Sequence, residues 1–430
     1  MFDTPKDRYQ KLKESSKNFL AIQLGISAFK YNRDENKFDA SSYTFHLFPR
    51  PFPKLDARFM FQSTSIEFLC NYDFDFNKLF YEGISFLNEE DEKKLLKHLK
   101  GRSLFEGLER DLSYVEEEII QDYCSQIAAW AATAKDDSEL ILDMKNAGTI
   151  ICYFVHQEAR SRFKNVWTFY VDQYHVRVKK VHDAERSALE CHSNDISKLT
   201  NDVLNSILGF SKLFKEIKKL KKPVIGHNIL LDLIMIYKQF IKPLPSSYEE
   251  FKKEIHEIFP DIYDTKTISF VLRDKLKRED SWHSNALNSL YDYLSKGRGS
   301  TIVLYLPAVN LLPEFNLESK SFHESGFDSF CAGSCFIKMA HIYSTWDEEK
   351  RYFTTRMLPP SVTEMFQSVS SLKNCINIMR AQVNHVIFDG PDPVSKRPEK
   401  IYVQVKGSKA LNISHVSVLN LVSGVIFYMF

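Results

Sequence analysis

The sequence predicts an α/β fold, and three observations support that prediction. Residues 224–232 read VIGHNILLD: a β-branched pair, a break at glycine and asparagine, then an apolar run with helical spacing that continues to Phe240. That pattern is typical of a strand, a tight turn and a helix. Apolar stretches at residues 19–24, 26–31 and 43–48 are typical of strands. A mostly apolar run that follows Asp328 and continues to Ala340 predicts a late helix.

Residues 4–16 carry the pattern of a helix that precedes these strands. Thr4 suits the N-cap, Pro5 the first helical position and Asp7 the first turn. The helix is expected to end near Ser16. The polar residues 32–37 are expected to form the turn between the second and third strands.

The character of the chain changes between residues 109 and 181. An amphipathic helix is expected at residues 115–132, followed by a segment that interleaves basic and aromatic side chains and includes Arg162, Lys164 and Trp167. Such a segment suits single-stranded nucleic acid, because phosphates meet the charges and bases stack on the rings. A solvated strand with core aromatics explains the same pattern and is favoured.

Composition limits the function classes that remain open. The 430 residues suffice for two or three domains, with 44% apolar and 26% charged residues. Lys and Arg (57) nearly balance Asp and Glu (56), so any RNA site must be a local basic groove. The seven cysteines are scattered; Cys331 and Cys335 are expected to be reduced core residues rather than Zn²⁺ ligands. Charges throughout the first thirty residues exclude a signal peptide.

The strand–turn–helix stretch carries the first candidate for chemistry. Asn228 suits the N-cap of the helix, and Asp232 follows four residues later on the same helix face. Its carboxylate then lies over the carboxyl end of the strand, where open α/β sheets place their ligands, and it suits Mg²⁺. A helix-start aspartate favoured by the macrodipole is an equally good explanation of this stretch alone.

A second acidic stretch, SFHESGFDSF at residues 321–330, places His323 five residues before Asp328. On one helix these side chains would lie about 140° apart, so they converge only if His323 is in the loop and Asp328 is in the first turns of the helix. A metal-assisted hydrolase needs such a set: carboxylates hold the ions and a histidine takes a proton from the attacking water.

These two stretches resemble the second and third motifs of the DEDD-type 3′-to-5′ exonucleases, in the subtype that pairs its last aspartate with histidine. The whole chain resembles the poly(A)-specific ribonuclease family, and is closest to its piRNA-trimming branch of PARN-like domain-containing exonucleases. The family motifs are FDTP (2–5), IQLG (22–25), FQSTSI (61–66), FDFN (74–77), DTK (264–266) and DGPD (389–392). Those of the branch are NVW (165–167), VKKV (178–181) and SYEEF (247–251).

The resemblance implies a ribonuclease-H-like fold that shortens single-stranded RNA, pre-piRNA or poly(A), from its 3′ end with Mg²⁺. Residues 1–110 and 183–395 would form a split exonuclease domain, 111–182 an inserted small nucleic-acid-binding module, and 396–430 a partial C-terminal domain. Asp232 and Asp328 would bind the metal and His323 would act as general base. Ile66 and Phe68 would line the RNA path, with core packing as the alternative, and Lys266 would approach a phosphate.

The family's first motif, Asp-x-Glu on the first sheet strand, lies upstream of FDTP, where this chain has only Met1. A two-metal site needs about four carboxylates, so the first strand is expected to be missing and this chain to be inactive as printed. A non-catalytic RNA-binding or partner-binding protein is the alternative. Residues 410–430 carry no charge; an incomplete small α/β domain is favoured there over a membrane anchor.

The resemblance also sets expectations about partners and location. Besides RNA, they are a piRNA-pathway protein that presents the RNA, a homodimer and a membrane tether. The expected location is cytoplasmic, at the mitochondrial outer membrane or the endoplasmic reticulum.

Overall fold

The computed structural model describes residues 2–49, 57–100, 114–135, 138–145, 147–172, 175–192, 201, 204–276, 282–313, 321–347, 352–354 and 358–395. The sequence predictions for residues 396–430 lie outside these ranges.

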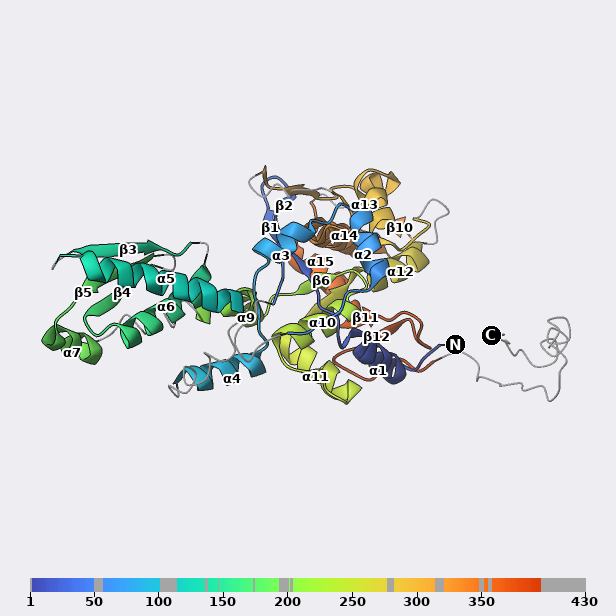
Figure 1. The fold of residues 1–430 in the computed structure, drawn as a ribbon. Helices are drawn as coiled ribbons and strands as arrows, with labels where there is room; N and C mark the ends of the chain where they lie inside the picture. Colours follow the sequence, from blue (N-terminus) through green and yellow to red (C-terminus); the bar gives the residue numbers. More distant parts are fainter. Residues whose placement is uncertain are drawn as a thin grey trace, which may run out of the picture.

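Short strands form the centre of the larger part of the molecule (Figure 1). β1 (Gln23–Asn32) and β2 (Lys37–His46) form an antiparallel hairpin, and β8 (Ala308–Leu311) pairs in parallel with β2. β6 (Val224–Gly226) pairs in parallel with β7 (Ile262–Asp264). The predicted polar turn at residues 32–37 is confirmed as the hairpin turn, and β6 confirms the strand predicted before Asp232.

The prediction of two strands at residues 19–31 is wrong, because one continuous strand, β1, runs from Gln23 to Asn32. Gly25, which looked like a break, marks a close approach between backbones instead. A Cβ atom added at Gly25 would lie 1.8 Å from the carbonyl oxygen of Ser325. The glycine therefore lets a distant helix start rest directly on the strand.

β1 and β6 contribute to the same two hydrophobic clusters although they are not paired with each other. Leu24 and Ile26 of β1 and Val224 of β6 pack against the first cluster. Phe29 of β1 and Ile225 of β6 pack against the second. Since side chains alternate between the faces of a strand, both strands lie between the same two helical layers. Among the described residues, each of them has one paired neighbour.

Helices cover both faces of these strands (Figure 1). The first cluster is built with α1 (Pro5–Ser16), α9 (Phe210–Leu220), α10 (Leu230–Phe240) and α11 (Tyr248–Ile258). The second is built with α12 (Thr265–Leu276), α13 (Leu287–Ser295), α14 (Ser325–Thr345) and α15 (Val362–Ser368). Shorter elements complete this part: α2 (Ser63–Asn71), α3 (Phe76–Glu82), η2 (Arg298–Thr301), β9 (Trp346–Asp347), β10 (Tyr352–Phe353), η4 (Ser370–Leu372), β11 (Cys375–Asn377) and β12 (His385–Ile387).

The first helix confirms its sequence signature in detail. α1 runs from Pro5 to Ser16, and the Thr4 side chain accepts a hydrogen bond from the backbone N–H of Asp7. Its end is held by Lys238 of α10, whose ammonium donates to the carbonyl oxygens of Ser16 and Lys17. A positive charge at a helix C-terminus satisfies carbonyls that lack partners within the helix.

The segment between residues 114 and 192 lies to one side of the strands that carry the predicted chemistry (Figure 1). It contains α5 (Tyr114–Thr133), β3 (Glu139–Asp143), α6 (Gly148–Arg162), β4 (Val166–Asp172), β5 (His175–Lys180) and α7 (Asp183–His192). The strands form an antiparallel sheet in the order β3-β5-β4, and α5 and α6 pack on it around a cluster that Leu95 and Ile207 also join from outside the segment. α5 confirms the predicted amphipathic helix.

α4 (Glu89–Lys100) and α9 are joined by ion pairs. Lys215 of α9 binds Glu92, and Lys218 binds Glu89. Two lysines of α9 therefore form ion pairs with the acidic helix α4, so their ammonium groups are engaged within the protein.

Candidate active site

The turn between β6 and α10 is built around one buried carboxylate, that of Asp264 at the end of β7. Its Oδ1 accepts from the backbone N–H of Asn228 at 2.8 Å and of Lys266 at 3.0 Å. Its Oδ2 accepts from the N–H of Ile229 at 3.2 Å and of Asn377 at 3.0 Å. Three separate segments of the chain are therefore fixed by a single fully buried side chain.

The predicted N-cap role of Asn228 is wrong, and Asp264 is the reason. Asn228 adopts φ +61°, and its side-chain oxygen accepts from the Nδ2 of Asn377 at 2.6 Å. The backbone N–H groups of Asn228 and Ile229, just before α10, donate to the carboxylate of Asp264. A side chain from a distant part of the chain therefore satisfies donors at this helix start. Burial raises the pKa of Asp264, and the four N–H groups oppose that rise.

Asp232 lies in the first turn of α10, as predicted. Its side chain reaches solvent, although neighbouring protein atoms partly desolvate the carboxyl group. That desolvation raises the pKa of Asp232 to about 6, and the nearby charge of Asp264 adds to the rise. A divalent cation at this carboxylate would offset both effects, since it favours the ionised form.

His227 ties the same turn to the next part of the chain. Its Nδ1 lies 3.0 Å from the Oγ1 of Thr265, and its Nε2 lies 3.1 Å from the carbonyl oxygen of Asn285. Burial lowers the pKa of His227 to about 4, and the charge of Lys266 lowers it further. The ring is therefore neutral near pH 7, and the carbonyl fixes the proton on Nε2.

The loop position predicted for His323 and the helix position predicted for Asp328 are both found, and the two residues are joined through the backbone of His323. His323 lies in the loop before α14, Asp328 lies in the first turn of that helix, and the backbone N–H of His323 donates to Asp328 Oδ1 at 3.3 Å. Glu324 caps the helix by accepting from the N–H of Gly326 and Phe327. Burial raises the pKa of Asp328.

The backbone of His323 adopts φ +76°, in the left-handed region. A residue other than glycine there costs on the order of 1 kcal/mol or more. The loop is therefore held by its surroundings rather than by its own preference.

Two rings of the α2 segment contact the His323 imidazole. The Tyr72 ring centroid lies 4.2 Å from that of His323, and the Phe68 centroid lies 5.0 Å from it. No residue of α2 is buried. Ile66 is 37% and Phe68 44% exposed, so core packing is excluded for both, and Phe68 presents apolar surface next to the histidine.

α14 connects the two halves of the site. Ser325, at its start, rests on Gly25 of β1, and its N–H donates to the side-chain oxygen of Gln23 at 3.0 Å. The hydroxyl of Ser329 lies 2.6 Å from that of Ser27. α14 also packs against β6, the strand that leads to Asp232. Asp328 and Asp232 are thus placed by elements that touch.

The donor chemistry of Asp232 and Asp328 fits Mg²⁺, which prefers carboxylate oxygens. Asp232 is exposed, and Asp328 uses one oxygen for the His323 N–H. Within the described ranges, no group of three or more His, Cys, Asp or Glu side chains lies close enough to hold a metal ion. Two carboxylates are fewer than the about four that a site for paired metal ions needs.

The basic-aromatic segment agrees with the favoured prediction of a strand with core aromatics at Trp167, rather than with the RNA-contact alternative. Trp167 is only 3% exposed, and the guanidinium carbon of Arg160 lies 4.0 Å from its ring centroid. Arg162 is paired with Glu158 at 2.6 Å and bonded to Gln121. The Trp167 ring is therefore not available to stack on RNA and Arg162 is engaged within the protein, whereas Lys164 is exposed.

His156 and Arg160 of α6 meet at one hydroxyl group of β4. His156 Nδ1 lies 2.7 Å from the Oγ1 of Thr168, to which Arg160 Nε donates at 2.9 Å. Burial lowers the pKa of His156 to about 3. This buried group joins α6 to β4 and has a structural role.

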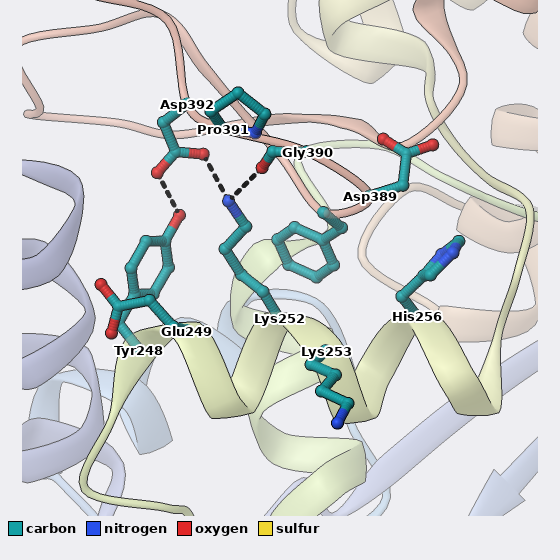
Figure 2. Close-up of a pocket in the computed structure, with 10 residues that line it drawn as sticks. Tyr248, Glu249, Lys252, Lys253, His256, Asp389, Gly390, Pro391 and Asp392 are labelled. Carbon is teal, nitrogen blue, oxygen red and sulfur yellow. Dashed lines mark hydrogen bonds and ion pairs between the residues drawn. The ribbon is translucent and has the colours of Figure 1, made fainter.

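A cavity of about 480 Å³ opens between α11 and residues 388–392 (Figure 2). Hydrogen bonds join the two sides of the cavity wall. Lys252 donates to Asp392 at 2.8 Å and to the carbonyl oxygen of Gly390 at 2.9 Å, and the Tyr248 hydroxyl donates to Asp392 at 2.9 Å. The SYEEF and DGPD motifs therefore meet here. None of the residues predicted for chemistry lines this cavity.

The described helices include none that combines the length and the apolar character needed to span a bilayer. The described cysteines are all free, and Cys331 and Cys335 are fully buried, as predicted.

Comparison with known proteins gives one consistent family. Residues 1–336 match the profile of the CAF1 family ribonucleases. The chain is 31% identical over 420 residues to the pre-piRNA 3′-exonuclease trimmer of Bombyx mori, covering 97% of this chain and 76% of that protein. It is 32% identical over 413 residues to the poly(A)-specific ribonuclease PNLDC1 of Mus musculus, covering 94% and 74%. Identity to the poly(A)-specific ribonuclease PARN of Danio rerio is 27% over 428 residues, covering 93% and 61%.

These matches confirm the predicted 3′-to-5′ exoribonuclease lineage, and the chain belongs to the CAF1 family of ribonucleases.

Proposed function

We propose that this ribonuclease shortens single-stranded RNA from its 3′ hydroxyl end in a reaction that requires Mg²⁺. The observation that carries the proposal is the placement of His323. It lies beside Asp328 and next to an exposed apolar side chain of α2. Asp328 belongs to α14, which packs against the strand leading to Asp232. The substrate class follows the relatives, whose names are a pre-piRNA 3′-exonuclease trimmer and poly(A)-specific ribonucleases.

The residues divide the chemistry between them. Asp232 and Asp328 would hold Mg²⁺, which supplies charge stabilisation for the phosphoryl oxygens when bound. His323 takes the proton from the attacking water, since among the described residues neither of its ring nitrogens is engaged in a hydrogen bond. Lys266 stands at the start of α12, where its charge can meet a phosphate.

RNA would approach along the exposed side of α2. Ile66 and Phe68 offer apolar contact surface there, and an exposed ring is a sequence-tolerant stacking platform for a base. Lys164 is the one residue that we retain from the predicted RNA contacts of the basic-aromatic segment.

We further propose that one more strand completes the sheet between β1 and β6 and contributes the remaining carboxylates. This is supported by the two strands sharing both hydrophobic clusters without pairing to each other. It is also supported by the two-carboxylate site, because paired ions need about four carboxylates. Residues 111–182 are proposed as an inserted module, supported by the hydrophobic cluster that α5, α6 and their sheet share, most of whose residues belong to this segment.

A non-catalytic RNA-binding protein is the second candidate, and the incomplete carboxylate set is what favours it. The deciding test is an assay on 5′-labelled single-stranded RNA with the full-length protein, with Mg²⁺ and with EDTA. The proposal expects a ladder that shortens from the 3′ end with Mg²⁺ only, and no shortening of RNA that ends in a 3′ phosphate. Bound but intact RNA in Mg²⁺ would support the second candidate.

A further inference from the structure

The rings of His323, Phe68 and Tyr72 form a closed triangle of contacts. Besides the 4.2 Å and 5.0 Å separations from His323, the Phe68 and Tyr72 centroids lie 4.8 Å apart. Phe68 and Tyr72 are four residues apart at the end of α2, so they project from the same side of the helix. Aromatic rings in tilted and edge-to-face contact hold one another in defined orientations.

Little else orients the imidazole. His323 is exposed, its loop has φ +76°, and its one backbone bond to Asp328 fixes the main chain rather than the ring. Among the described residues, no hydrogen bond to either ring nitrogen restrains rotation about the side-chain torsions. The two rings of the α2 segment are therefore the contacts that decide where the histidine points.

We propose that Tyr72 is a positioning residue for His323, and that the α2 segment couples the seating of RNA to the placement of the general base. The inference rests on the proposed function.

The route of the coupling is short. Phe68 is 44% exposed, so one part of its side chain is open to RNA while its ring meets the imidazole in edge-to-face contact. α2 has no buried residue, and its position depends on surface contacts of this kind. RNA bound on Phe68 holds α2 against the site, and Tyr72, which packs against both Phe68 and the imidazole, passes that restraint to His323.

The experiment compares Tyr72→Ala with Tyr72→Phe in the full-length protein. Tyr72 is 44% exposed, so neither substitution threatens the fold. Tyr114→Ala is the matched control, because Tyr114 is an 80% exposed tyrosine at the start of α5. Steady-state trimming of a 3′-extended single-stranded RNA gives kcat and KM. Histidine-selective ¹³C NMR reports the ring-current shift of the His323 signal, which His323→Gln identifies.

Tyr72→Ala is expected to lower kcat by roughly tenfold or more with KM nearly unchanged, because a misplaced catalytic group loses rate rather than binding. The same variant should move the His323 signal. Tyr72→Phe should retain both the rate and the signal position, and Tyr114→Ala should change neither.

Three results would overturn the inference. Full kcat in Tyr72→Ala, in a protein whose wild type trims RNA, removes the role of Tyr72 and leaves the proposed function intact. A wild-type protein that does not trim RNA removes the proposed function and this role together. An unmoved His323 signal in Tyr72→Ala contradicts the ring contact itself, whatever the activity.

Discussion

The two halves of the site are held in opposite ways. On the Asp232 side, one fully buried carboxylate accepts four backbone N–H groups from three segments and fixes the turn before α10. On the His323 side, an exposed residue with a positive φ is held by one backbone bond and two partly exposed rings.

This difference separates a fixed part of the site from an adaptable part. The turn before Asp232 cannot shift without breaking buried hydrogen bonds, whereas His323 can move when α2 moves. A metal ligand needs a constant position, and a base that meets a moving RNA end needs to be placed when the substrate is present.

The largest expected effect comes from Asp264→Asn. The amide would point its NH₂ group at N–H donors that now meet a carboxylate oxygen, which leaves buried groups unsatisfied. The free energy of unfolding in urea should fall by about 3 kcal/mol, and trimming should be lost with it. Asp328→Asn, which changes a half-buried carboxylate with one weak bond, should be much closer to wild type in stability. Equal losses in the two variants would remove the distinction between the halves.

His323→Ala tests the adaptable half. Trimming should slow by roughly 10²- to 10⁴-fold, as expected for loss of a general base. The unfolding free energy should stay within about 0.5 kcal/mol, because the side chain is exposed. His182→Ala, at another exposed histidine, should leave both quantities unchanged. A large stability loss in His323→Ala would show that this loop is part of the fixed half.

Acidification should weaken the fixed half through His227. Its pKa in the folded protein, about 4, lies below the value of about 6.5 expected in the unfolded chain. The unfolded chain therefore binds more protons between these values, and stability falls as the pH falls from 6.5 to 4. The stability advantage of wild type over His227→Gln, read from urea melts at several pH values, should shrink over that window. An advantage that grows on acidification would contradict the neutral ring.

The smallest effect is expected at Ile66. Ile66→Ala removes exposed apolar surface next to the proposed RNA path, which should raise KM a few-fold, on the order of 1 kcal/mol of binding. Neither kcat nor stability should change. Ile141→Ala, at an exposed isoleucine of β3, is the control. A change in kcat alone would move Ile66 from substrate binding to the placement of His323.

Sequence reading recovered the elements whose signals are local. The cap of α1, the strand–turn–helix around Asp232 and the loop position of His323 all depend on residues within a few positions of one another. The site residues missed were those defined by distant contacts. Asp264 stood inside a recognised motif, DTK, yet its role required Asn377, more than a hundred residues away.

The errors have the same origin. The two predicted strands were separated at Gly25. The residue whose backbone requires a glycine there, Ser325, lies three hundred residues further along the chain. RNA contact by Trp167 stayed open as the less-favoured alternative because the arginine that covers its ring, Arg160, belongs to the preceding helix. An acid that ends a fully buried strand is the one signal that would have pointed to Asp264, since such a carboxylate must find donors.

The most direct test of the account is Asp232→Asn in the full-length protein. The amide keeps the shape of the side chain but removes the charge that would hold Mg²⁺. Binding of single-stranded RNA, measured by filter retention, should equal that of wild type, while 3′ trimming in Mg²⁺ should collapse. Asp34→Asn, at an exposed aspartate of the β1–β2 turn, should trim normally. Trimming at the wild-type rate by Asp232→Asn would contradict the assignment of the site.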